Sequence, residues 1–173
     1  MINPLSSSAA QHHGIDFIRT SRPATSILYT ANTKFEIGKA HVVKQSANDK
    51  IVFIGAGVTL HECLKAADQL EKEIGLSARV IDPFTIKPLD VQTIVDNVAQ
   101  VGGRVVVVED HYPEGGIGEA VSRALLTFGK VPTSVFVHLA VKEVPRSGQP
   151  AELLSKYGID AQAIVNAVKK LGN

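Results

Sequence analysis

The sequence has a single cysteine and no tryptophan, and only 20% of its residues are charged. One cysteine cannot form an intrachain disulfide, so we expect a reducing compartment and place the protein in the cytoplasm. No apolar run approaches the roughly 20 residues of a transmembrane helix, and the first residues resemble neither a signal peptide nor a transit peptide. The formal net charge is +1 with basic residues scattered along the chain, so we expect neither nucleic acid nor a membrane as partner.

Length and composition favour one globular domain. A chain of 173 residues with 45% hydrophobic residues is long enough for one proper core and too short for two. Residues 1–14 are small and polar without periodicity, which predicts a flexible leader or the remnant of a tag. His12 and His13 in this stretch could bind a metal, but no other ligand stands at a useful spacing, so we interpret them as a solvated pair.

Strand-like and helix-like segments alternate from residue 41 onward. Strands are predicted at 41–45, 51–57, 78–82, 104–109 and 134–141, with helices after each of the last four and weaker strand candidates at 14–21 and 26–30. This alternation predicts an α/β fold, a three-layer αβα domain whose mostly parallel sheet has helices on both faces. The short connection from 45 to 51 predicts a hairpin between the first two strands, which would make one edge antiparallel.

Local signals predict how the helices begin and which faces they bury. Asp90 and Asp160 are expected to cap their helices, and Thr59 with Glu62 is expected to form a capping box. Cys63 lies on an apolar stripe, which favours core packing over a reactive thiol. In the helix at 117–128 the apolar spacing predicts an inward face made by Ile117, Val121, Leu125 and Phe128.

Two glycine-rich loops follow predicted strands. "IGAGVTL" (54–60), with Asp82 downstream, imitates a dinucleotide fingerprint, but Leu60 takes the third glycine position and Pro83 directly follows Asp82. "EGGIGEA" (114–120) lacks the Lys-Ser/Thr pair of a P-loop, and carboxylates nearby, Glu109 among them, would repel phosphate. We interpret its glycines as allowing positive φ and close packing. A free-standing nucleotide-binding domain stays an alternative.

Two histidines are candidates for chemistry. His111, beside Asp110, could be an acid–base group, although we favour a loop histidine that satisfies backbone groups or a subunit contact. His138 lies inside a predicted strand, which is typical of a satisfied core histidine. The sequence has no zinc-protease, dithiol or serine-hydrolase motif. Residue by residue, it predicts an α/β domain without an assembled active site.

Several stretches together resemble the C-terminal domain of transketolases, especially the animal-type enzymes. They are "FIRTSRP", "IGAGVTLHE", "RVIDPFTIKPLD", "VEDHYPEGGIGEAV", "HLAVKEVPRSGQPAELL" and "YGIDAQAI". They follow the family's order and spacing from Gly14 to Leu171. Each stretch alone is a weak signal, but "DPFTIKPLD" and "EDHYPEGGIGEAV" together are highly specific.

The resemblance implies a parent enzyme that is a homodimer using thiamine diphosphate and a divalent cation, usually Mg²⁺ or Ca²⁺. Such enzymes transfer a two-carbon ketol unit between ketose and aldose phosphates in the pentose phosphate pathway. The resemblance also implies a five-stranded sheet with one antiparallel edge strand, in a domain that supports dimer assembly. The family's G-D-G metal signature is absent from the sequence. We therefore expect this chain to hold no cofactor, metal or catalytic residue and to be inactive alone.

One substrate-binding residue is also implied by the resemblance. In "RTSRP", Arg22 matches the family's binder of the substrate phosphate, whereas Arg19 does not match that role. A guanidinium group presents a planar fork to phosphate oxygens, and Pro23 favours an extended backbone at Arg22. The implied boundaries are 15–40 for the end of the pyrimidine-binding domain with its linker, and 41–173 for the C-terminal domain. The corresponding domain of a 2-oxo acid dehydrogenase β subunit or a deoxyxylulose-phosphate synthase is the alternative.

Overall fold

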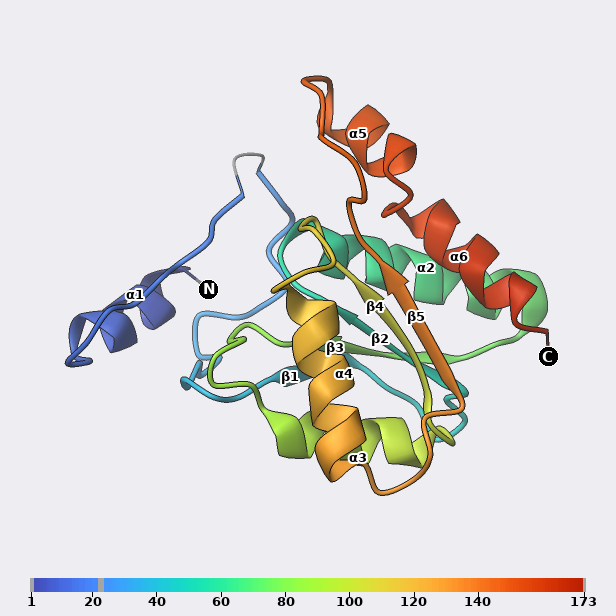
Figure 1. Ribbon diagram of the computed structural model, residues 1–173, viewed down its shortest axis with the longest axis horizontal. Coiled ribbons are helices and arrows are strands. Elements are labelled where there is room, and N and C mark those ends of the chain that lie inside the picture. Colours follow the sequence, from blue (N-terminus) through green and yellow to red (C-terminus); the bar gives the residue numbers. More distant parts are fainter. Residues whose placement is uncertain (1, 22–23, 173) are drawn as a thin grey trace.

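The structure, a computed structural model, describes residues 2–21 and 24–172 and has an open sheet between two layers of helices (Figure 1). The strands are β1 (His41–Lys44), β2 (Ile51–Gly55), β3 (Ala78–Asp82), β4 (Arg104–Val108) and β5 (Val135–Leu139). The helices are α1 (Ile2–Ala10), α2 (Val58–Ile74), α3 (Val91–Gln100), α4 (Ile117–Phe128), α5 (Pro150–Lys156) and α6 (Ala161–Lys170). The predicted three-layer α/β class is confirmed.

The sheet has the order β1-β3-β2-β4-β5, in which only the edge pair of β1 with β3 is antiparallel. Its central strands are continuous apolar runs because both faces are covered. Alternate residues point to opposite faces, so Phe53 packs in one core with α2 and α6, whereas Val52 and Ile54 pack in the other with α3 and α4. The two cores hold the sheet between its helix layers.

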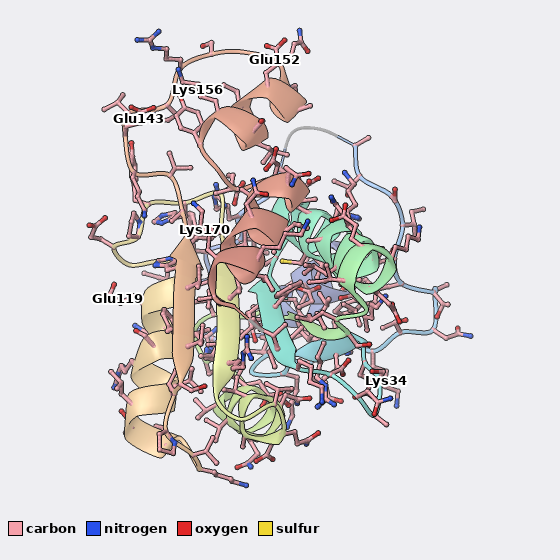
Figure 2. All side chains as sticks on the ribbon, turned by 90° about the vertical axis from the view of Figure 1, so that its right-hand side faces the viewer. Lys34, Glu119, Glu143, Glu152, Lys156 and Lys170 are labelled. Atoms are coloured by element: carbon pink, nitrogen blue, oxygen red, sulfur yellow. The ribbon has the colours of Figure 1, made fainter. Side chains whose placement is uncertain are left out.

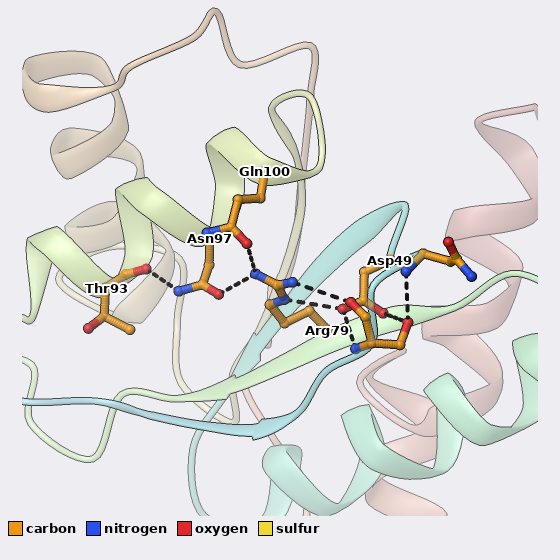
Figure 3. Close-up of polar contacts among 7 residues, drawn as sticks. Asp49, Arg79, Thr93, Asn97 and Gln100 are labelled. Carbon is orange, nitrogen blue, oxygen red and sulfur yellow. Dashed lines mark hydrogen bonds and ion pairs between the residues drawn. The ribbon is translucent and has the colours of Figure 1, made fainter.

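The antiparallel edge was predicted correctly, but the partner of β1 was not. We expected a hairpin of β1 with β2, whereas β3 lies between them. The connection at 45–50 meets the beginning of β3, where Arg79 reaches it: Nε lies 3.1 Å from Asp49 Oδ2 and Nη2 lies 3.5 Å from the Ser46 carbonyl (Figure 3). This contact holds the connection against the beginning of β3.

The stretch before β1 differs from the sequence expectation. Residues 14–21 and 26–30 were strand candidates, but neither forms a strand, and Ile15 and Phe17 are 99% and 88% exposed. The period-two pattern alone does not make a strand, because a strand needs a neighbour and neither segment pairs with one in the described structure. The expected leader contains helix α1, which the sequence did not predict. The boundaries at 14 and 40 stay a prediction.

The helix ends largely follow their local signals. Asp90 and Asp160 accept hydrogen bonds from Thr93 N and Ala163 N, which confirms both caps. The inward face of α4 is confirmed for Ile117, Val121 and Leu125, but Phe128 is 61% exposed. Phe128 is the last residue of α4, where the helix no longer covers the sheet.

Candidate functional site

The carboxyl ends of β2 and β4 define the place where an open α/β sheet ordinarily binds its ligand. After β2 the chain forms β3 on one side of β2 and then crosses over to form β4 on the other side of β2. The order of strands therefore reverses at β2. Both glycine-rich loops lie here, one after β2 and one after β4. We therefore ask what occupies the space between them.

Glu109 fills the anion position at the beginning of α4. This residue follows β4 directly and is 2% exposed. Its Oε2 accepts a hydrogen bond from Ile117 N at 2.7 Å, and its Oε1 accepts one from Gly118 N at 3.0 Å. A helix N-terminus binds phosphate through these same first N–H groups. The carboxylate of the protein itself thus takes the place that a phosphate would need.

The glycines of this loop allow the close approach of Glu109 and His138. A Cβ at Gly116 would overlap the Glu109 carboxylate, and a Cβ at Gly118 would overlap the His138 ring. Gly115 has φ +71°, a left-handed conformation that favours glycine. The interpretation of these glycines as packing and turn residues is confirmed.

The loop after β2 is held against the end of β4 by a side-chain hydrogen bond. Thr59 Oγ1 lies 2.9 Å from the Val108 carbonyl and 3.0 Å from the Ala56 carbonyl, which ties the beginning of α2 to the end of β4. A Cβ at Gly55 would stand 2.9 Å from Cys63 Sγ. The beginning of α2 therefore packs closely against the ends of β2 and β4.

The capping box predicted at α2 is wrong. Gly57 occupies the N-cap position and no side chain caps the helix, because Thr59 is turned to the two carbonyls. Glu62 instead accepts a hydrogen bond from Ala161 N at 2.9 Å and pairs with Lys65 at 2.7 Å. Its carboxylate thus stabilises the beginning of α6, a helix far away in the sequence.

His111 and His138 have different surroundings. His138 Nε2 lies 2.5 Å from Glu109 Oε1, so the prediction of a satisfied histidine is confirmed. His111 is exposed, and its Nδ1 lies 2.9 Å from the Tyr112 carbonyl. The neighbouring carboxylates are engaged elsewhere, Glu109 at α4 and Asp110 with Arg19. An acid–base group made of His111 and these carboxylates is not assembled.

Arg19 makes the contact that the sequence did not predict. Its Nη1 donates to Asp110 Oδ1 at 2.5 Å and its Nη2 donates to the Asp110 carbonyl at 2.9 Å. The segment before β1 is thereby held at the loop after β4, 91 residues away in the sequence. Arg22, the predicted phosphate ligand, lies outside the described residues. The motif match that separates Arg22 from Arg19 carried no signal for the contact of Arg19 with Asp110, because the two residues are far apart in the sequence.

Other candidate ligands are not gathered into a site. His12 Nδ1 lies 3.1 Å from Asp16 Oδ2, and within residues 2–21 and 24–172 no three His, Cys, Asp or Glu side chains are placed to hold a metal ion. Cys63 is buried, and burial raises the pKa of its thiol, which confirms the core interpretation. A thiamine diphosphate–metal group does not fit these residues, because the helix N-terminus after β4 is already filled.

The described structure is thus an open α/β domain in which a carboxylate of the chain, Glu109, occupies the helix N-terminus after β4. The chain matches the family model of "Transketolase, C-terminal domain" over residues 38–164. It belongs to the transketolase C-terminal domain family.

Known relatives agree with this assignment. The chain is 56% identical over 163 residues to a transketolase of Mus musculus, covering 94% of the chain and 26% of the relative. It is 55% identical over 163 residues to a transketolase-like protein 1 of Bos taurus, covering 94% and 27%. The chain therefore spans about a quarter of the length of these relatives.

Solved structures show the same fold. A split-gene transketolase, described as an inactive beta4 tetramer, superposes with a TM-score of 0.87 at 32% identity and covers 96% of this chain and 53% of that one. A transketolase of Leishmania mexicana gives a TM-score of 0.56 at 20% identity, over 78% of this chain and 18% of that one, and supports the fold alone.

Proposed function

We propose that this chain is the structural, dimer-supporting C-terminal part of a transketolase. The parent enzyme transfers a two-carbon ketol unit between ketose and aldose phosphates in the pentose phosphate pathway. The family match together with 55–56% identity to animal transketolases across 94% of the chain carries the proposal. The structural role is supported by Glu109, whose carboxylate occupies the helix N-terminus where a phosphate-binding α/β domain would hold its ligand.

The parent's cofactors and partners follow from the same proposal. Thiamine diphosphate and Mg²⁺ or Ca²⁺ bind to the upstream domains of a homodimeric, cytoplasmic enzyme, and none of them binds to this chain. Charged side chains of both signs point outward from different elements, which supports the absence of a nucleic-acid surface (Figure 2). Those labelled are Lys34, Lys156 and Lys170 with Glu119, Glu143 and Glu152. In the described structure no helix is long and apolar enough to cross a bilayer.

An activity assay tests the structural role. The folded chain is mixed with thiamine diphosphate, Mg²⁺, xylulose 5-phosphate and ribose 5-phosphate, and the formation of glyceraldehyde 3-phosphate is followed. We expect no turnover from the chain, while a full-length animal transketolase in the same buffer is active. Turnover that copurifies with the chain would contradict the proposal and require a thiamine site within it.

A chimera tests both the family role and Arg22. Here the chain replaces the matching quarter of the mouse transketolase, and we expect the chimera to be active. Arg22→Gln should raise the KM for a phosphorylated ketose about tenfold and leave the KM for an unphosphorylated ketose nearly unchanged, because the role proposed for this guanidinium is to bind the substrate phosphate. Arg19→Gln is the matched control and should affect both ketoses alike. Equal effects of Arg22→Gln on both would overturn its role.

The alternatives are less well supported. The relatives of highest identity reported above are transketolases or transketolase-like proteins, which favours transketolase over other thiamine enzymes. Isothermal titration with NAD⁺ or ATP tests the nucleotide-binding alternative. We expect no heat of binding, because Glu109 occupies the helix N-terminus, and micromolar binding would support that alternative.

A further inference from the structure

The segment that precedes β1 is fastened to the domain in steps. We define residues 24–40 as the strap. Near β1 it is pinned by backbone contacts: Gly38 N donates to Thr85 Oγ1 and Ala40 N donates to Asp90 Oδ2, both at 3.0 Å. Farther from β1 the strap is exposed, with Ile27 92% exposed. Between these two parts stands Tyr29, which the structure brings to the carboxyl end of β3.

Tyr29 packs into an aromatic socket, formed by Phe35, His41 and Phe84, and reaches the Asp82 carboxylate. Its hydroxyl donates to Asp82 Oδ2 at 2.5 Å. Its ring meets Phe35 edge-on at 5.0 Å, and Phe35 in turn meets both Phe84 and His41 at 5.0 Å. Two residues of the strap thus pack against the ends of β1 and β3.

Asp82 is the unusual member of this socket. It is fully buried, and in the described structure its Oδ1 has no hydrogen-bond partner. A buried carboxylate with one satisfied oxygen is costly when ionised and much less costly when protonated. Opening the strap removes Tyr29 from this carboxylate and lets water reach it.

We propose that Tyr29 and Asp82 form a pH-sensitive latch, which holds the strap on the domain in acid and loosens it as Asp82 ionises. This latch goes beyond the proposed function and does not depend on it. Among the described residues, two titratable groups face Asp82: the Tyr29 phenol from the strap and the His41 imidazole from β1. The upstream contact of Arg19 with Asp110 is exposed and belongs to a separate anchor.

The direction of the pH effect follows from the pKa of Asp82, which differs between the closed and the open strap. Burial raises the pKa of Asp82 from 3.8 to about 6, against smaller lowering effects of Tyr29 and His41. In the open strap, water surrounds the carboxylate, so its pKa returns toward 3.8. The closed state therefore binds the proton more tightly and gains population as pH falls. From these two pKa values of Asp82, the ratio of chains with an open strap to chains with a closed strap should be about tenfold higher at pH 7.5 than at pH 5.

Hydrogen exchange of the intact chain tests the latch. Peptides covering residues 24–36 are followed by mass spectrometry at pH 5 and pH 7.5, with rates corrected for the intrinsic pH dependence of exchange. We expect about tenfold faster corrected exchange at pH 7.5. Asp82→Asn should reduce the difference to less than about twofold, since an amide does not titrate in this range. Corrected rates that agree at the two pH values would overturn the proposal.

Two further variants separate titration from packing. Tyr29→Phe removes the hydroxyl but keeps the ring and Asp82, so exchange should accelerate at both pH values while the pH dependence persists. Asp110→Asn, the control, changes a carboxylate that holds Arg19 and should leave the pH dependence of the strap intact. If Asp82→Asn does not fold, a carbon NMR titration of the Asp82 carboxyl in the unmutated chain tests the latch instead. A midpoint below about 4.5 would refute the latch, because the free carboxyl already titrates near 4.

Discussion

At the scale of single residues, the Glu109 carboxylate occupies the position at a helix N-terminus that a bound anion occupies in related folds. It offers two oxygens to the first N–H groups of α4 and a hydrogen bond to His138, all within the buried layer beneath the glycine loop. Negative charge at a helix N-terminus is favourable, and hydrogen bonds to a charged group are stronger than neutral ones. The first N–H groups of α4 therefore have hydrogen-bond partners without a ligand.

Replacing this carboxylate should cost stability. Glu109→Gln should lower the free energy of unfolding by about 2 kcal/mol, since one amide oxygen replaces two acceptor oxygens and an amide N–H₂ is left facing donors. Urea unfolding followed by circular dichroism measures the loss. Glu119→Gln, on the exposed side of the same helix, is the control and should cost less than about 1 kcal/mol. Equal losses would show that the buried position of Glu109 is unimportant.

At the scale of elements, the helix caps differ in what they connect. In the part of the chain that the structure describes, the Asp160 carboxylate accepts a hydrogen bond from Ala163 N alone, at 2.8 Å, within its own helix. Asp90 accepts from the backbone and hydroxyl of Thr93 and also from Ala40 N of the strap, at 3.0, 2.8 and 3.0 Å. One carboxylate thus begins α3 and fastens the segment that leads into β1.

Alanine at the two caps should give unequal losses. Asp160→Ala should cost about 1 kcal/mol, the usual value for a lost cap, and Asp90→Ala about 2 kcal/mol because the strap also loses a partner. Thermal or urea unfolding gives both values. Hydrogen exchange at Ala40 should rise only in Asp90→Ala. Unchanged exchange there would contradict the double role of Asp90.

At the scale of the whole molecule, one buried network joins three distant parts of the chain. Arg79 of β3 pairs with Asp49 before β2 and donates to Asn97 Oδ1 and Gln100 Oε1 of α3, both at 2.6 Å (Figure 3). The Asp49 and Arg79 side chains are 2% and 9% exposed. The network fixes the amino-end side of the sheet, opposite to the glycine loops.

Breaking this ion pair should destabilise the fold more than breaking a surface pair. Asp49→Asn should lower the free energy of unfolding by about 3 kcal/mol, because the buried Arg79 charge loses its counterion. Added salt should change this loss little. Lys169→Gln removes the exposed pair of Lys169 with Glu73, which joins α6 to α2, and should cost much less stability than Asp49→Asn. Similar losses in the two variants would contradict the importance of burial.

The local sequence determined the elements from β1 onward, because their signals are short-range. The apolar runs of β2 and β4 and the caps Asp90 and Asp160 depend on a few neighbouring residues, and all were predicted. The α/β class follows from their alternation. The family followed from motifs and their spacing, which the sequence carries without any coordinates.

Contacts between residues far apart in the sequence needed the tertiary structure. Glu109 could be predicted as unfavourable for phosphate, but only the fold shows that it occupies the helix N-terminus itself. Three such contacts are the pairing of β1 with β3, the pair of Arg19 with Asp110 and the bond of Tyr29 with Asp82. They join residues 36 to 91 positions apart in the sequence. Such pairs leave no periodic trace in the sequence, because the two partners come together only when the chain folds.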